Sequence, residues 1–204
     1  MESESAPSAA SQSAAGNIYL VGLMGAGKTS VGKLLARRLG KTFYDCDQEI
    51  ERSTGVRIPV IFEIEGEAGF RARERKMLAE LVERSDAVLA TGGGVVLAEQ
   101  NRKLLKEHGV VVYLCASPQD LWRRTRHDRN RPLLQTSDPL SKLAELYKIR
   151  DPLYRDIADL VVDTGNQSVS ALAHRLEQKL AQHATNVRPT EVEASMSQAK
   201  TCAP

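Results

Sequence analysis

A phosphate-loop pattern near the N-terminus constrains this chain more than any other feature. The stretch from Gly22 to Thr29, GLMGAGKT, fits G-x-x-x-x-G-K-[ST] and lies between the apolar run Ile18–Val21 and an amphipathic segment from Thr29 to Leu39. A strand, a glycine loop and a helix in this order aim successive backbone N–H groups at one anion. Lys28 would reach the β- and γ-phosphates, and the Thr29 hydroxyl would bind Mg²⁺. We therefore expect a nucleoside triphosphate here, against the alternative of a glycine turn with an incidental lysine.

Length and composition indicate one soluble domain. The chain has 204 residues and 42% hydrophobic content, enough for a substantial core. Its net charge of +2 gives no reason to expect nucleic acid or a membrane surface as a partner. There is no apolar run of membrane-spanning length, no secretory signal pattern and no metal-binding spacing of the three cysteines. We expect a cytoplasmic monomer.

Both ends of the chain are predicted to be disordered tails. Residues 1–16 are rich in Ser and Ala, and residues 184–204 are polar and small, so neither can offset the entropy of ordering. An organelle transit peptide is the alternative for the first tail, but Glu2 and Glu4 and the lack of any basic residue argue against it. The folded body is therefore expected to span residues 17–183.

Within the body, short apolar runs alternate with longer helical patterns, which is typical of an α/β protein. The predicted strands are Ile18–Val21, Thr42–Tyr44, Ala87–Ala90, Val110–Leu114 and Leu160–Val162. This alternation predicts a five-stranded parallel sheet flanked by helices on both faces. Ligands of such sheets bind beyond the carboxyl ends of the strands, so the residues that follow each strand are candidates for the site.

Two carboxylates follow the second strand, and three glycines follow the third. Asp47 precedes or begins a helix-like segment, Gln48 to Ser53, and could simply cap it. A P-loop enzyme also needs a carboxylate near Mg²⁺, and Asp45 is the better candidate because the Ala87–Ala90 strand ends without one. The stretch Gly92–Gly94 leaves backbone N–H groups bare and could line a substrate pocket, although a plain flexible turn is the alternative.

An arginine cluster follows the fourth strand. Between Trp122 and Arg131 lie five arginines: Arg123, Arg124, Arg126, Arg129 and Arg131. Guanidinium groups match phosphate oxygens, and mobile arginine-rich segments close over nucleotides in many phosphoryl-transfer enzymes. We therefore predict a lid at about residues 123–138. The charged helix expected from Arg71 to Glu83 is interpreted mostly as a solvated face.

Taken together, these motifs resemble the shikimate kinase family, over about residues 17 to 175. The motifs that carry the resemblance, in chain order, are Gly25–Thr29, Asp45–Ile50, Phe62–Glu63 with Gly69–Arg71, Gly92–Gly94, Arg131–Leu133 and Arg150–Tyr154. The resemblance implies a P-loop kinase fold of the nucleoside-monophosphate-kinase type. It implies ATP-dependent phosphorylation of the shikimate 3-hydroxyl, a step in the synthesis of chorismate and the aromatic amino acids.

The resemblance also implies the site residues and the cofactors, ATP and Mg²⁺. Shikimate would be held by Asp47, Arg71, Gly93 and Arg150. ATP would be held by Gly25, Ala26, Gly27, Lys28, Thr29, Ser30, Arg131 and Gln167. Thr29 and Asp45 would hold Mg²⁺, and Lys28, Asp47 and Arg131 would carry the catalysis. Pro59 departs from the bulkier residues expected in the shikimate-side wall.

Three alternatives use the same phosphate loop. Another small-molecule kinase, such as a gluconate kinase, would not need two arginines for a ring carboxylate. A GTP-binding switch would show an N-K-x-D-type element, which this sequence lacks. A nucleic-acid-binding ATPase would need a larger basic footprint than one short arginine cluster.

Overall fold

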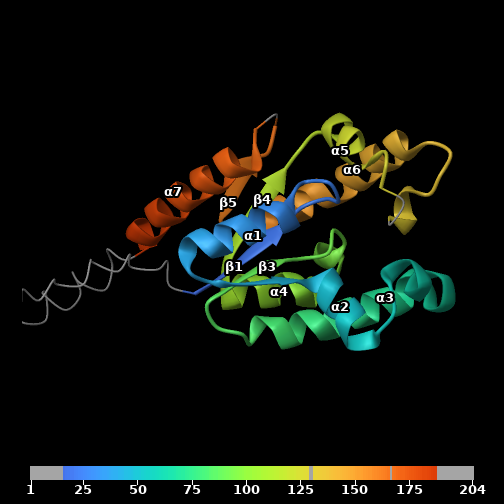
Figure 1. Ribbon diagram of the computed structural model, residues 1–204, viewed down its shortest axis with the longest axis horizontal. Coiled ribbons are helices and arrows are strands. Elements are labelled where there is room, and N and C mark those ends of the chain that lie inside the picture. The colour runs from blue at the N-terminus through green and yellow to red at the C-terminus, as the bar shows by residue number, and fades with distance from the viewer. Residues whose placement is uncertain (1–15, 129–130, 166, 188–204) are drawn as a thin grey trace, which may run out of the picture.

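The protein folds around a five-stranded, all-parallel β-sheet with the order β2-β3-β1-β4-β5 (Figure 1). The computed structural model describes residues 16–128, 131–165 and 167–187. The strands are β1 (Asn17–Val21), β2 (Thr42–Asp45), β3 (Ala87–Ala90), β4 (Gly109–Cys115) and β5 (Leu160–Asp163). All five predicted strands are confirmed, and each predicted end lies within one residue of the observed one.

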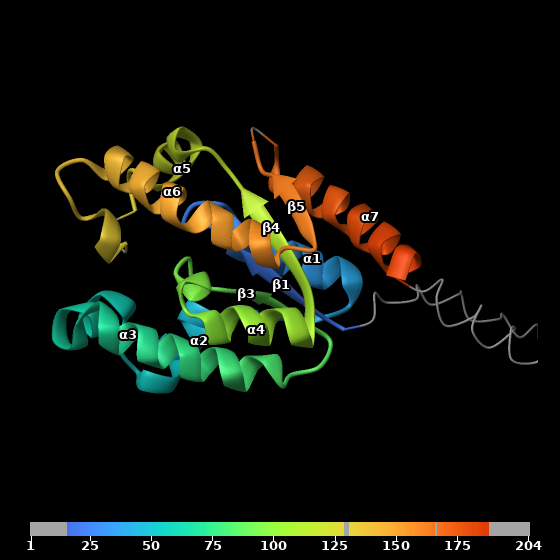
Figure 2. The ribbon, with the colours of Figure 1, turned by 180° about the vertical axis from the view of Figure 1, so that it is seen from behind.

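Helices connect successive strands and cover both faces of the sheet. Within the described ranges they are α1 (Lys28–Leu39), α2 (Cys46–Thr54), α3 (Ile58–Val82), α4 (Glu99–His108), α5 (Pro118–Thr125), α6 (Pro139–Ile157) and α7 (Val169–Val187), with two short 3₁₀ helices, η1 (Val95–Leu97) and η2 (Pro132–Leu134). Helices α1 and α7 pack together on one face (Figure 1), while α4 and α6 lie on the other, where α4 also contacts α3 (Figure 2). Strands β1 and β3 are buried on both faces, which explains why β3 is entirely apolar and why Asn17 is the one amide side chain in β1.

Two glycines allow the loop after β1 to fold tightly against its neighbours. At Gly22, where φ is +140°, a Cβ would lie 2.6 Å from the carbonyl oxygen of Leu114 in β4. At Gly25, where φ is +81°, a Cβ would lie 2.6 Å from Cγ2 of Thr125 at the end of α5. The backbone conformation and the lack of space both require glycine. The loop is therefore held between β4 and α5 at the carboxyl edge of the sheet.

Helix α3 is longer than the sequence predicted. It begins at Ile58 rather than Arg71, and Pro59 occupies its first turn, where a missing N–H disturbs no helical hydrogen bond. Gly66, with φ 68° and ψ −176°, divides the helix into two halves at a kink. Because of this break and the proline, the sequence pattern shows only the second half. Pro59 therefore lies in the first turn of a helix whose residues Ile58 and Phe62 line a cavity described below.

Two predicted boundaries also differ from the structure. Residues 123–125, the first part of the predicted lid, form the last turn of α5. Helix α7 continues to Val187, so the prediction that disorder begins at 184 is wrong for its first four residues. The remainder of that tail, residues 1–15 of the other tail and Arg129 lie outside the described residues.

Candidate functional site

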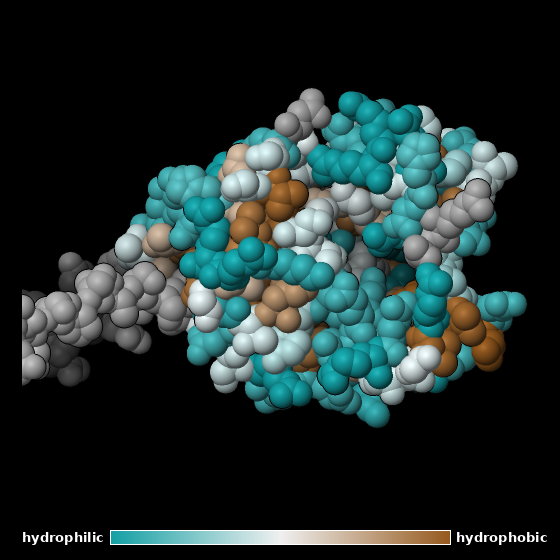
Figure 3. Space-filling view, viewed as in Figure 1, coloured by the Kyte–Doolittle hydropathy of each residue, from teal (hydrophilic) through white to brown (hydrophobic). Residues whose placement is uncertain are grey.

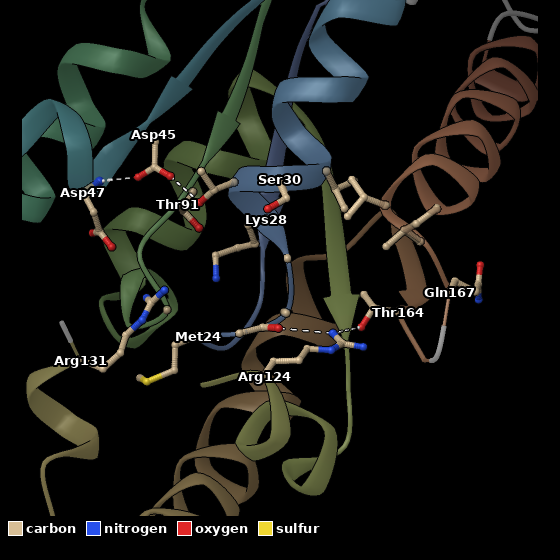
Figure 4. A pocket seen from close by; sticks show the side chains of 18 residues that line it. Met24, Lys28, Ser30, Asp45, Asp47, Thr91, Arg124, Arg131, Thr164 and Gln167 are labelled. Atoms are coloured by element: carbon tan, nitrogen blue, oxygen red, sulfur yellow. Dashed lines mark hydrogen bonds between the residues drawn. The ribbon is translucent and has the colours of Figure 1, made fainter. Parts of the chain in front are cut away.

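A deep cleft opens at the phosphate loop. It has a volume of about 390 Å³ and is lined by the six residues from Gly25 to Ser30, together with side chains from β2, α5 and α7 (Figure 4). Helix α1 begins here after Gly27, whose φ is +94°, and no side chain caps its first turn in the described structure. The N–H groups of that turn are therefore available to an anion. In Figure 3 the surface is hollowed between α3 and the α5–α6 side of the molecule.

Lys28 lies over the loop and points into this cleft (Figure 4). Its Nζ donates to the carbonyl oxygens of Gly22, at 2.6 Å, and Leu23, at 3.0 Å. Burial and the nearby Arg131 guanidinium lower the pKa of Lys28 to about 8. The hydrogen bonds of this ammonium group to Gly22 and Leu23 are made to neutral carbonyls, and a phosphate group would give it a negatively charged partner.

Asp45 joins the loop to the second strand. It is the last residue of β2, and its Oδ2 accepts a 2.6 Å hydrogen bond from the Thr29 hydroxyl. Its Oδ1 caps α2 by accepting from the N–H groups of Asp47, at 3.1 Å, and Gln48, at 3.3 Å. The alternative that Asp47 caps this helix is therefore wrong, because Asp45 does so. Thr29 and Asp45 thus place two oxygen atoms side by side, and oxygen is the ligand type that Mg²⁺ prefers.

The Asp47 side chain is free to act in the cleft. Its Oδ1 is buried and has no hydrogen-bond partner among the described residues. Burial, with the nearby charges of Asp45 and Glu74, raises the pKa of Asp47 to about 6. Figure 4 shows its carboxylate on the same side of the cleft as Lys28 and Arg131. A buried, unpaired acid at this position is suited to accept a hydrogen bond or a proton from a ligand.

Three residues at the α5 and α7 side of the cleft extend it beyond the phosphate loop. Arg124 donates from Nη1 to the Gly25 carbonyl, at 3.3 Å, and to the Thr164 hydroxyl, at 3.0 Å, and from Nη2 to the Gly165 carbonyl. Gln167 lines the far end of the cleft (Figure 4). Arg124 and Thr164 were not predicted as site residues. The arginine cluster was a signal for Arg124, but nothing in the sequence indicates that Arg124 contacts the loop after β5.

A second, smaller cavity of about 70 Å³ adjoins the cleft. Met24, Asp47, Gly93 and Arg131 line both. The other side chains of the small cavity include Ile58, Phe62, Phe70, Arg71, Glu74 and Arg150. All four predicted shikimate-side residues therefore lie together here. The Nε of Arg131 also donates to Asp128 Oδ2 at 3.0 Å.

The two arginines of the small cavity have different surroundings. Arg71 lies flat against Gly94, where any Cβ would clash with its guanidinium, and it forms ion pairs with Glu74, at 2.7 Å, and Glu67, at 2.9 Å. Glu74 is almost fully buried, and its burial raises its pKa. Arg150 is also buried, and its Nη1 donates to the Gly93 carbonyl at 3.0 Å. Glu74 was missed by the prediction, which treated the charges of this helix as solvated.

Unpaired polar atoms concentrate at this cavity. Four buried side-chain nitrogen or oxygen atoms lack a hydrogen-bond partner among the described residues, and three of them belong to Asp47, Glu74 and Arg150. Buried polar groups are normally paired, so such a cluster indicates that a polar ligand completes the site. The ligand must offer hydroxyl groups to the carboxylates and an anion to the guanidinium groups.

Comparisons with known proteins agree with this chemistry. A family model described as shikimate kinase matches residues 24–181. A shikimate kinase of Thiobacillus denitrificans is 63% identical over 80% of this chain and 90% of its own, and one of Burkholderia pseudomallei is 58% identical over 86% and 95%.

Solved structures give the same match. The shikimate kinase from Acinetobacter baumannii, in complex with shikimate, superimposes with a TM-score of 0.81 at 51% identity, covering 82% of this chain and 94% of that one. A gluconokinase from Sinorhizobium meliloti shares the fold alone, with a TM-score of 0.59 at 21% identity over 86% and 97%.

Proposed function

The chain belongs to the shikimate kinase family, and from that premise we propose how its residues divide the transfer of the terminal phosphoryl group of ATP to the 3-hydroxyl of shikimate. The P-loop kinase fold of the nucleoside-monophosphate-kinase type that the sequence predicted is confirmed. One observation supports the division above all: the phosphate cleft and the two-arginine cavity meet at Asp47 and Gly93. A hydroxy-acid in the small cavity would thus present its hydroxyls to the phosphate end.

The small cavity is the proposed shikimate site. Arg71 and Arg150 bind the carboxylate, since a guanidinium offers paired donors to its two oxygens. The Gly93 N–H adds a third donor. Asp47 accepts hydrogen bonds from the ring hydroxyls, which satisfies its unpaired Oδ1. Ile58, Phe62 and Phe70 supply the apolar wall against which the ring carbons pack.

The cleft is the proposed ATP site. The loop from Gly25 to Ser30 surrounds the phosphates, and Lys28 leaves the Gly22 and Leu23 carbonyls to pair with them. Arg131 reaches the transferring phosphoryl group from the segment that follows α5. We propose that this segment, which extends to about residue 138, closes over the nucleotide as a lid. Gln167 borders the adenine, and Arg124 stands between the phosphate loop and the loop after β5.

A magnesium ion fits the pair formed by Thr29 and Asp45. Their oxygens are 2.6 Å apart and line the cleft. No group of three or more His, Cys, Asp or Glu side chains in the described ranges could hold a metal alone, which agrees with an ion shared with substrate phosphates. When bound, Mg²⁺ would neutralise phosphate charge. Thr29 would contact it directly, and Asp45 through water.

The chemical step then needs little covalent work from the protein. The 3-hydroxyl oxygen forms a bond to the γ-phosphorus as the bond to the ADP oxygen breaks, and the hydroxyl proton passes toward the Asp47 carboxylate. With a pKa of about 6, Asp47 is mostly ionised at neutral pH and able to accept it. Lys28 and Arg131 stabilise the charge on the transferring group, so positioning and electrostatics supply most of the catalysis.

Coupled ADP release with a panel of hydroxy-acids tests this function. We expect ADP release with shikimate and none above background with gluconate, because gluconate lacks the ring that the apolar wall packs against. Release with gluconate alone would favour the gluconate kinase alternative, which now rests on a shared fold only.

The remaining expectations concern the state of the protein in the cell. No described helix is long and apolar enough to span a membrane. We propose that the enzyme is a monomer. Substrates that are small and polar also support the expected cytoplasmic location and give no role to nucleic acid. Light scattering of the purified chain tests the monomer: a mass twice that of the chain would contradict it.

A further inference from the structure

Tyr154 links helix α6 to the glycine turn beside the shikimate cavity. Its side chain is fully buried, and its ring stacks on that of Tyr113 with centroids 4.8 Å apart. Its hydroxyl donates to the Gly93 carbonyl. Burial raises the pKa of this hydroxyl, so it remains a donor at neutral pH. Tyr154 does not line the cavity, so it acts on any ligand through Gly93.

The Gly93 carbonyl receives two donors from the same helix. Arg150 and Tyr154 are four residues apart on α6 and therefore share one face. Arg150 Nη1 donates to the carbonyl at 3.0 Å, alongside the tyrosine hydroxyl. The preceding peptide is also fixed, because the Gly92 carbonyl accepts from the Val95 N–H at 3.2 Å. Since peptide groups are planar, the bond to the Gly92 carbonyl sets the direction of the Gly93 N–H, and the two bonds to the Gly93 carbonyl set that of the Gly94 N–H.

Binding of an anion changes the balance between the two donors. Arg150 has one buried nitrogen, Nε, that finds no partner within the part of the chain that the structure describes, while its Nη1 donates to the Gly93 carbonyl. If the guanidinium turned toward a carboxylate, the Gly93 carbonyl would lose this donor. A carbonyl left unpaired in the interior is unfavourable, so the turn would relax if it had no second partner. The Tyr154 hydroxyl is that second partner.

We propose that Tyr154 is a positioning residue for shikimate. Its hydroxyl holds the peptide between Gly93 and Gly94 in place, which frees Arg150 to bind the carboxylate while the glycine turn beside the substrate keeps its shape. The proposal rests on the proposed assignment of Arg150 and Gly93 to shikimate. It extends that assignment by a residue that contacts neither substrate.

The substitution Tyr154→Phe removes the hydroxyl and keeps the ring that stacks on Tyr113. The matched control is Tyr147→Phe on the same helix, whose hydroxyl contacts Cys115 Sγ at 3.8 Å, outside both cavities. We expect Tyr154→Phe to raise the KM for shikimate about tenfold, as for loss of one hydrogen bond at a binding site. The KM for ATP and kcat should stay within about twofold of the parent, and Tyr147→Phe should change none of these values.

The comparison distinguishes positioning from a general structural role. If Tyr154→Phe lowers Tm and raises both KM values equally, or if it changes neither KM, the inference is overturned. Arg150→Ala, measured in parallel, tests the assignment beneath it. An unchanged KM for shikimate in Arg150→Ala would overturn that assignment and the inference together. If the KM for shikimate is raised in Arg150→Ala but unchanged in Tyr154→Phe, the inference alone is overturned.

Discussion

Arg71 and Arg150 should differ in what their removal does to the protein. Arg71 neutralises Glu74, whose side chain is 1% exposed and lies 2.7 Å away. Arg150 forms no ion pair among the described residues, and burial lowers its pKa. One arginine therefore stabilises the fold, while the other is held ready for a ligand. We predict that alanine at position 71 mainly reduces stability and alanine at position 150 mainly reduces shikimate binding.

The magnitudes follow from these surroundings. Arg71→Ala leaves a buried carboxylate unpaired, which costs about 3–5 kcal/mol of unfolding free energy. Protonation of Glu74 limits this cost, since its pKa is already raised. Arg150→Ala loses one hydrogen bond but removes a buried cation, so stability should change by under about 1 kcal/mol.

Shikimate binding should show the opposite order. Arg150 can give two charge-assisted bonds of about 1.5–3 kcal/mol each, so its loss should weaken affinity about 10²- to 10⁴-fold. Arg71 is already engaged by Glu67 and Glu74, so we expect it to give shikimate the equivalent of one such bond. Its loss should weaken shikimate affinity about 10- to 100-fold.

Denaturant unfolding and titration calorimetry with shikimate measure the two quantities. The double variant Arg71→Ala/Glu74→Gln serves as the control, because it removes the unpaired charge: it should regain stability but not affinity. Parent-like stability of Arg71→Ala at pH 7 would refute the role of Glu74 as a buried anion. Unaltered shikimate affinity of Arg150→Ala would remove that arginine from the site.

Four further predictions concern the remaining residues. Lys28→Ala should lower kcat at least about a hundredfold with an unchanged circular dichroism spectrum, and near-parent turnover would count against it. Arg131→Ala should also slow turnover, and ATP plus shikimate together should protect residues 131–138 from proteolysis more than either alone; equal cleavage in all conditions would exclude closure. Burial raises the pKa of Glu74 in the folded state above its ordinary value of 4.5, so its charged form opposes folding and the parent should lose stability relative to Glu74→Gln as pH rises above that value; a constant difference would disprove this. Asp45→Asn keeps a good helix cap but weakens a hard-cation ligand, so half-maximal activity should need more Mg²⁺, and an unchanged Mg²⁺ titration would be the contrary result.

The parts of this fold that sequence predicts are those governed by local pattern. Short apolar or aromatic runs bounded by polar residues located all five strands, and the signal is strongest for β1 and β3, which are buried on both faces. The phosphate loop was evident because left-handed backbone and close packing at Gly22 and Gly25 admit only glycine. The first half of α3 was missed because Pro59 and Gly66 interrupt its helical pattern, although each is placed where a helix tolerates it.

The parts that sequence could not predict depend on tertiary packing. Glu74 follows Arg71 by three residues, a spacing that also occurs on solvated helices, and only the packing of α3 against the glycine turn buries it. Arg124 meets Gly25 and Thr164 because α5 lies across the loops after β1 and β5. The roles of Asp45 and Asp47 were open for a similar reason: local spacing allows either to cap α2, and the fold assigns the cap to Asp45.

The kink at Gly66 separates two kinds of recognition within the proposed shikimate site. On the N-terminal side of the kink, Ile58 and Phe62 give the cavity its apolar wall. Ile64 on the same segment is 76% exposed, so the core does not constrain it. On the C-terminal side of the kink, Arg71 contributes positive charge, and Glu74 and Gly94 hold its side chain in place. Mutations in the outer half can therefore remodel the contour of the pocket while the anion anchor is preserved. We expect new ring specificities in this scaffold to evolve through residues 58–65, with the arginines inherited unchanged.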